Sequence, residues 1–162
     1  MGYTHYYNID NCGKQDEIGY EKSLPIIRKV LKKYNNRIQK ECDDDKKPVC
    51  TKKNVRFNGI GDDGHEIFYF NIKDAGHFTF CKTARKPYDI VVCEVLLILN
   101  AYCPHMTISS DGFSGYLENK KIDGEWENAV KNVKEYGINY HIEVVEEREP
   151  YCNFEPILDS ME

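Results

Sequence analysis

The sequence predicts an α+β fold: one compact domain in which a mixed sheet of about five to six strands packs against three helices. Segments that alternate between apolar and polar residues, as strands do, are interspersed with segments of helical periodicity. One helical segment, residues 87–102, is almost wholly apolar, so we expect it to be buried in the core. The length of 162 residues suits a single domain with a sizeable core.

The first predicted elements are a strand and a helix. Residues 2–9 alternate between two faces and are predicted to form a strand. A helix is predicted to begin near Ser23, a suitable cap, with Pro25 in its first turn and an apolar stripe that continues to Ile38. Its outer face is rich in lysine and arginine, and residues 41–54 after it are predicted to be an exposed loop.

A hairpin and a β-α-β unit are predicted in the middle of the chain. The hairpin strands are residues 55–60 and 65–72, joined by the turn sequence Gly-Asp-Asp-Gly. A short strand at 77–81 is followed by the apolar helix at 87–102, and a further strand is predicted at 106–110. If these elements form a crossover, the two strands run parallel and the connection is right-handed.

A third helix, a last strand and a tail complete the prediction. The helix carries Trp126 on its apolar face and is stopped by Gly137. Residues 138–145 alternate as a strand. We therefore assign residues 1–145 to the domain and expect residues 146–162 to be an acidic C-terminal tail that packs only in part.

Charge and composition exclude several classes of protein. A formal net charge of −5 disfavours a general duplex nucleic-acid binder, which carries a broad basic surface. The longest apolar run, residues 90–99, is too short to span a bilayer and no secretory leader is recognisable, so no membrane association is predicted. The seven cysteines include no Cys-x-x-Cys, a pattern typical of an intracellular, reducing compartment. Neither a metal nor a cofactor is predicted.

The segment before the apolar helix is predicted to bind an anion. Lys82, Arg85 and Lys86 lie just ahead of the helix start, where the helix dipole disfavours cations. Phosphate and carboxylate groups are common occupants of such a position, because the unpaired N–H groups of the first turn donate to them. The alternative is that the cations are solvated and that Thr83 caps the helix locally.

A second loop is expected beside this one. Both loops leave the carboxyl ends of parallel strands if the crossover forms, so they share the sheet edge at which open α/β sheets hold ligands. Ser109, Ser110 and Asp111 there offer hydroxyl groups and a carboxylate, although this segment can also be a simple turn. The candidate ligand-binding residues are Lys82, Thr83, Arg85, Tyr88, Ser109, Ser110, Asp111, Tyr3 and Tyr6.

Catalysis is an alternative that depends on histidines and carboxylates. His5 or His65 can serve as a general base. Glu66 or Asp111 would assist, and the protein would then be a nucleotide or phosphoester hydrolase. Two His-x-Thr-x tetrapeptides also match the motif of two-histidine phosphoesterases. They lie too close together for the two lobes of those enzymes, so chance explains them better.

Several motifs resemble an uncharacterised family of small proteins from phages, large DNA viruses and some bacteria. These motifs are the opening Met1-Gly2-Tyr3-Thr4-His5-Tyr6, the block Asn58-Gly59-x-Gly61 with His65-Glu66-x-Phe68, the run Cys81-Lys82-Thr83-Ala84-Arg85-Lys86-Pro87-Tyr88-Asp89 and the turn Ser109-Ser110-Asp111-Gly112. The resemblance covers residues 1–9 and 55–115. It implies a viral or phage-like, soluble intracellular protein and no particular activity. Phe113 stands where members often carry an acidic-Trp element.

The sequence thus leaves three functional hypotheses. The leading one is that the protein binds a small phosphorylated ligand, in particular a nucleotide, with its phosphate at the basic loop and its base stacked on a tyrosine. The second is hydrolysis of such a ligand. The third is a virion or host-protein interaction module, without a small-molecule site, that uses residues 41–54 or 146–162.

Overall fold

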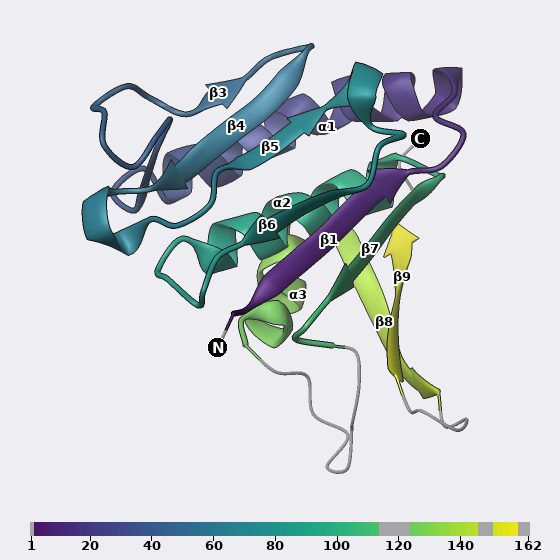
Figure 1. Cartoon of the computed structure of the whole chain (residues 1–162). Helices are drawn as coiled ribbons and strands as arrows, with labels where there is room; N and C mark the ends of the chain where they lie inside the picture. Colours follow the sequence, from purple (N-terminus) through teal and green to yellow (C-terminus); the bar gives the residue numbers. More distant parts are fainter. Residues whose placement is uncertain (1, 114–123, 146–150, 159–162) are drawn as a thin grey trace.

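Three strands that lie far apart in the sequence form the sheet β6–β1–β7 (Figure 1). β1 lies in the middle and pairs antiparallel with both neighbours, so β6 and β7 run in the same direction on either side of it. The computed structural model describes residues 2–113, 124–145 and 151–158. Its helices and strands are β1 (Thr4–Ile9), α1 (Lys14–Lys33), β2 (Ile38–Gln39), β3 (Val49–Cys50), β4 (Asn54–Gly59), β5 (Phe68–Asn71), β6 (Thr79–Lys82), α2 (Asp89–Tyr102), β7 (Met106–Ser110), α3 (Trp126–Val133), β8 (Ile138–Val145) and β9 (Tyr151–Leu158).

The α+β class and the β6–α2–β7 crossover are confirmed, but the arrangement of strands differs from one mixed sheet. Every strand pairing in the described part of the chain is antiparallel, and the strands form three groups. The reason is that β1 hydrogen-bonds to both β6 and β7 and so occupies the place that a direct parallel pairing of these two strands would need.

The β4–β5 hairpin forms the second group, with β2 and β3 as short antiparallel partners of β4. This confirms the predicted hairpin, whose connection contains a 3-10 turn at Gly61–Asp63. Residues 41–54 were predicted to be loop alone, yet they contain β3, because the backbone there pairs with β4. The third group is β8 with β9, and β8 coincides with the predicted strand at 138–145.

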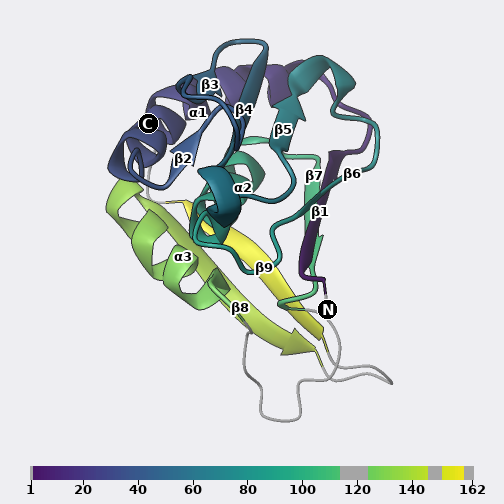
Figure 2. The same cartoon turned by 60° about the vertical axis from the view of Figure 1, so that its left-hand side comes forward.

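α2 is the centre of the hydrophobic core. Every residue from 90 to 99 is buried, which confirms the predicted core helix. α1 and α3 pack against α2, and the sheet β6–β1–β7 lies on another side of it (Figure 2). Among the residues that the structure describes, no helix combines the length and the apolar character needed to cross a membrane.

α1 begins at Lys14 rather than near Ser23, so the predicted N-terminal end of this helix is wrong. The Asp16 carboxylate accepts a hydrogen bond from the Gly13 N–H (2.9 Å), which caps the helix. The first half of the helix is mostly polar, so no apolar stripe signals it in the sequence. Pro25 is tolerated in the interior because it lies on the exposed side, where water satisfies the carbonyl that its missing N–H leaves free.

The C-terminal region is more regular than the predicted tail. Residues 151–158 form β9, which pairs along its length with β8 (Figure 1). Among the described residues β9 pairs only with β8, and proline is tolerated on a strand that is paired on one side. Gly137, with φ of 76°, ends the turn after α3 as predicted. Residues 146–150 and 159–162 of the predicted tail lie outside the described residues.

The contact between α1 and the end of α2 leads to a test of this packing. A Cβ atom added to Gly19 would lie 1.8 Å from the backbone oxygen of Tyr102, so one of the two helices must move. We expect Gly19→Ala to lower the free energy of unfolding by about 1–3 kcal/mol, measured by urea denaturation. Gly76→Ala is the control, because its Cβ would meet no atom closer than 3.8 Å. A gain in stability at Gly19, as helix propensity alone requires, would contradict this packing.

Candidate functional site

The carboxyl ends of β6 and β7 and the start of β1 meet at one edge of the sheet, beside the first turn of α2. The register places Thr4 opposite Lys82, and His5 opposite Ser110. The basic loop begins at the last residue of β6, and the Ser-Ser-Asp-Gly segment begins with the last two residues of β7, so both lie at the same sheet edge, as the crossover predicts. The sequence did not show that the N-terminal strand lies between them.

His5 is the centre of a buried hydrogen-bond network at this edge. Its ring Nδ1 lies 2.7 Å from Ser110 Oγ, and its Nε2 lies 2.6 Å from Asp89 Oδ1. The Thr83 hydroxyl donates to the same carboxylate oxygen. All of these side chains are at most 2% exposed, so water does not compete for their hydrogen bonds.

Ser110 connects this network to α3. Its Oγ accepts hydrogen bonds from the Trp126 Nε1–H (2.9 Å) and from the Gly112 N–H (3.0 Å). Each nitrogen of a neutral imidazole either donates or accepts, so the tautomer of His5 sets the direction of its bonds to Ser110 Oγ and to Asp89 Oδ1.

Aromatic rings enclose the network. The His5 ring lies edge-on to Tyr3, with centroids 5.1 Å apart, and to Trp126, at 5.0 Å. Burial raises the pKa of Tyr3 above its ordinary value of 10.0, so its hydroxyl stays protonated. The guanidinium carbon of Arg85 lies 4.0 Å from the centroid of the Tyr3 ring. Arg85, which was predicted to bind phosphate, therefore also covers one of the rings around the network.

Ser110, His5 and Asp89 are hydrogen-bonded in the same order as the groups of a hydrolytic triad, but their surroundings indicate a structural role. A substrate must reach the nucleophile, and the base must be able to take its proton. Ser110 is 1% exposed and already accepts bonds from two N–H groups. Both ring nitrogens of His5 have partners. The network therefore fastens β1 to β7 and to α2, and this argues against His5 as a base.

Three potential metal ligands also lie close together here. They are His5, Asp89 and Cys93, and each has one ligand atom within 4.8 Å of a ligand atom of the other two. A tetrahedral zinc site separates its nitrogen and oxygen ligands by about 3.3 Å. His5 Nε2 and Asp89 Oδ1 are 2.6 Å apart, which is a hydrogen-bond distance. Burial, together with the Asp89 carboxylate, raises the pKa of the Cys93 thiol well above its usual value. This geometry fits a hydrogen-bond network better than a metal centre.

The basic loop is a sharp turn. Ala84 and Arg85 both have positive φ, at 52° and 59°. Lys86 Nζ donates to a backbone carbonyl (3.0 Å), Lys82 is half-buried and Arg85 is exposed. The Asp89 carboxylate lies in the first turn of α2, so the helix start already has a negative charge from the chain itself.

The predicted ligand-binding residues divide between interior and surface. Those in the interior are Tyr3, Thr83, Tyr88 and Ser110, whereas those that are half-buried or exposed are Tyr6, Lys82, Arg85, Ser109 and Asp111. Tyr88 is fully buried, with its hydroxyl donating to the Glu66 carbonyl (2.6 Å), so its ring is not available to stack on a base. Of the two candidate bases, His65 is the exposed one, and its Nδ1 lies 2.9 Å from the Lys82 carbonyl.

The outer side of the sheet carries exposed aromatic side chains. Phe78 is 66% exposed and Phe80 is 52% exposed. The half-buried Tyr6 stacks on Phe78, with centroids 5.8 Å apart and planes inclined by 22°. We call these three residues the aromatic face. In the described ranges, no helix covers this side of β6, β1 and β7 (Figures 1 and 2).

Strand alternation separates the aromatic face from the buried network. In β1, His5 points to α2, so Tyr6 points to the opposite side. In β6, Phe80 and Lys82 are two residues apart and share the outer side. Phe78 and Phe80 were not among the predicted site residues, although the alternation of the predicted strand was sufficient to place both on one side.

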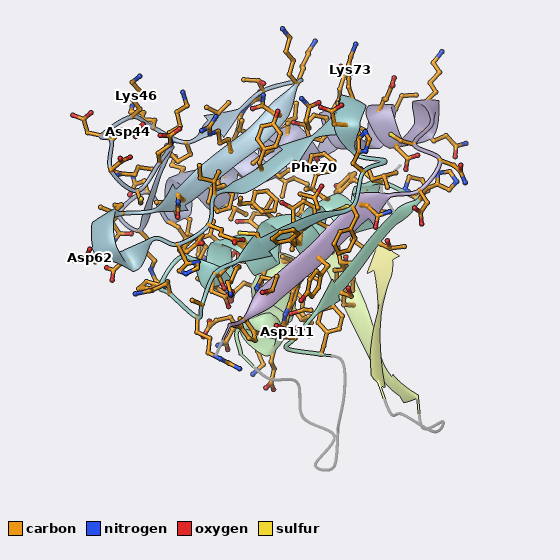
Figure 3. The ribbon with its side chains drawn as sticks, in the orientation of Figure 1. Asp44, Lys46, Asp62, Phe70, Lys73 and Asp111 are labelled. Atoms are coloured by element: carbon orange, nitrogen blue, oxygen red, sulfur yellow. The ribbon has the colours of Figure 1, made fainter. Side chains whose placement is uncertain are left out.

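Asp111 and Ser109 border the aromatic face on the β7 side. Asp111 Oδ2 accepts a hydrogen bond from the Thr4 N–H (3.0 Å), and the residue lies at the lower end of the sheet in Figure 3. Ser109 is exposed and lies opposite Tyr6 in the register. Carboxylate and hydroxyl groups therefore flank the aromatic face on one side, and Lys82 of β6 flanks it on the other.

A second buried carboxyl group, that of Glu94, joins the three helices. The Tyr34 hydroxyl donates to Glu94 Oε2, and Asn132 Nδ2 lies 3.2 Å from the same oxygen. The other oxygen, Oε1, has no hydrogen-bond partner among the described residues. Burial raises the pKa of Glu94 above its ordinary value of 4.5, which favours the protonated form.

Comparisons with known proteins do not identify a relative. No protein-family model, no curated protein and no solved structure matches this chain. The resemblance to an uncharacterised family therefore stays a prediction, and the function has to follow from the geometry of the molecule.

The buried network can be tested through two adjacent serines. Ser110→Ala removes the hydrogen-bond partner of several buried groups, among them the Trp126 indole N–H, the Gly112 N–H and His5 Nδ1. We expect it to lower the free energy of unfolding by about 2–4 kcal/mol in urea denaturation. Ser109→Ala, at the exposed neighbouring position, should change it by less than about 0.5 kcal/mol. Equal stability of the two variants would contradict the role of Ser110.

The raised pKa of Glu94 leads to a prediction about how the stability of the fold depends on pH. Because its pKa is raised in the folded state, its contribution to stability is full below pH 4.5 and is lost as the pH rises through the folded-state value. We therefore expect Glu94→Gln, which cannot ionise, to gain stability relative to the wild type between about pH 4 and pH 7. Urea unfolding across this range measures the difference. The exposed Glu127→Gln should show no such trend, and a relative loss for Glu94→Gln as the pH rises would refute the assignment.

Proposed function

We propose that this protein binds a nucleotide on the outer side of the sheet β6–β1–β7. The base stacks on the aromatic face, and the phosphate lies against Lys82, which shares the outer side of β6 with Phe80. The observation that carries this proposal is that the exposed Phe78 and Phe80 and the half-buried Tyr6 lie together on an uncovered sheet, next to Lys82.

The exposure of the aromatic face is what favours a ligand. Core aromatic residues of this protein, such as Phe57 and Phe68, are fully buried, whereas Phe78 and Phe80 keep more than half of their surface in contact with solvent. A stacked base removes part of this apolar surface from water, and each base–aromatic stack contributes about 1–3 kcal/mol. Single-stranded nucleic acids and nucleotides are bound in this way on open sheets.

The positions of the cations favour a phosphorylated ligand. Lys82 follows Phe80 by two residues on the same side of β6, so their Cα atoms are about 7 Å apart. Arg85 lies in the turn that follows, and its guanidinium packs on the Tyr3 ring, on the side of the buried network. Because the chain has a formal net charge of −5 and few cations at this edge, a mononucleotide or a short single strand suits it better than a long nucleic acid.

A protein partner is the second candidate, because an exposed aromatic patch can also be an interaction surface. The interaction module thus stays an alternative, with the aromatic face as the proposed protein contact instead of residues 41–54 or 146–162. Hydrolysis of a bound nucleotide would need His65, with Glu66 or Asp111 nearby, since His5 is enclosed. A viral or phage-like origin and an intracellular location stay expectations from the resemblance and the cysteine pattern.

Isothermal titration calorimetry with the four ribonucleoside monophosphates, ATP and a thymidine tetranucleotide tests this proposal. We expect binding that Phe80→Ala and Tyr6→Ala each weaken at least about tenfold, the cost of one lost stack. Lys82→Gln should weaken the binding of AMP but not that of adenosine, because only AMP has a phosphate. Tyr69→Ala is the matched control, since Tyr69 is an exposed tyrosine on β5, outside the aromatic face.

Two outcomes would reject nucleotide binding at this place. One is the absence of any heat or thermal stabilisation with the whole panel. The other is a Phe80→Ala variant that binds as well as the wild type. If the wild type instead self-associates in analytical ultracentrifugation and Phe80→Ala does not, the aromatic face is a protein interface.

A further inference from the structure

A groove on another part of the molecule has the chemistry of a second binding site. It lies between α1 and the chain segment around β2 and β3, and its volume is about 700 Å³. We propose that this groove binds a single-chain amphiphile with an anionic head group, a carboxylate or a phosphate. This inference is independent of nucleotide binding, because no residue of the aromatic face lines the groove.

The size of the groove suits a small molecule. Ligand sites commonly enclose about 300–1,000 Å³, and the groove lies within that range. A second cavity, beside Tyr7, has only about 30 Å³, which is room for a water molecule. Of these two cavities, the groove is therefore the one that can hold a ligand.

Cations are concentrated around the groove. Arg28 and Lys32 of α1 line it on one side, and Lys46 and Lys47 line it on the other, with Asp45 as the single acidic residue. All four cationic residues are exposed, and within the described residues none of them forms an ion pair. Four cations in one place are notable in a chain with a net charge of −5. They provide an attractive potential for an anion.

The inner surface of the groove is aliphatic. Ile38 and Leu31 are core residues that line it, and Pro48 and the 39% exposed Ile60 add further apolar surface. Burying an alkyl chain there removes apolar surface from water on both sides, at about 25 cal/mol per Å². No aromatic residue lines the groove, so a nucleotide base would have no ring to stack on. An aliphatic floor with a cationic rim matches a fatty-acid-like or lipid-phosphate-like molecule.

Cys50 lines the groove and reports on its occupancy. It is a free, half-buried thiol, as is Cys12, which lies outside the groove. Burial raises the pKa of both thiols, which slows their alkylation, so the rate of each cysteine with a probe is compared with its own rate without one. The full-length protein is treated with N-ethylmaleimide at mildly alkaline pH, and the modification rate of each cysteine is read by peptide mass spectrometry.

The probes are dodecyl phosphate, dodecanoate, dodecyltrimethylammonium and inorganic phosphate, each below its micelle concentration. We expect one or both anionic amphiphiles to slow alkylation of Cys50 at least about fivefold and to leave Cys12 unchanged. Which of the two protects Cys50 better distinguishes a phosphate head from a carboxylate head. The cationic amphiphile lacks the anionic head group, and inorganic phosphate lacks the alkyl chain. Neither should therefore change the alkylation rate of Cys50.

Variants test whether the protection of Cys50 depends on the cations that line the groove. The double variant Lys46→Glu and Lys47→Glu changes exposed residues and should abolish the protection, whereas the Lys46→Arg and Lys47→Arg pair should retain it. Lys29→Glu, an exposed cation of α1 that does not line the groove, is the control. The proposal is overturned if neither anionic amphiphile protects Cys50, if the cationic amphiphile protects Cys50 equally, or if Cys12 is protected as well as Cys50.

Discussion

The hydrogen bond between His5 Nε2 and Asp89 Oδ1 is the contact on which the arrangement of the other elements depends. It joins the middle strand of the sheet to the first turn of the central helix. Ser110 and Thr83 extend the network to β7 and to the loop after β6. Because each buried polar group would cost about 1–3 kcal/mol without its partner, the sheet and α2 are held in one relative position.

The same strand that anchors the fold also presents its outer side to solvent. His5 and Tyr6 are neighbours in the sequence, yet one belongs to the core and the other to the aromatic face. Substitutions on the two sides should therefore have separable consequences, for stability on one and for the proposed binding on the other. The groove beside α1 is a third region: Figure 3 shows Lys46 at the opposite end of the molecule from Asp111. Charges so placed act independently, since salt screens them over about 8–10 Å.

Local sequence patterns predicted the elements that are determined by short-range periodicity and turn residues. The apolar run of residues 90–99 identified the core helix, strict alternation identified the strand at 138–145, and Gly137 marked a chain reversal. The start of α1 was missed because its first turns are polar and are held by a cap and by packing against the end of α2. β9 was missed because its partner, β8, and not its own composition, makes it a strand.

For the candidate site, the sequence by itself determined that a basic loop and a serine-rich turn follow two strands joined through a buried helix. Periodicity and turn chemistry are local, so they can be read without the fold. The tertiary structure alone decided that β1 lies between those strands and that Ser110 and Thr83 turn inward to His5 and Asp89. It also left Phe78 and Phe80 in solvent. The side of a strand that becomes buried depends on long-range hydrogen bonds and packing, and no local pattern encodes these partners.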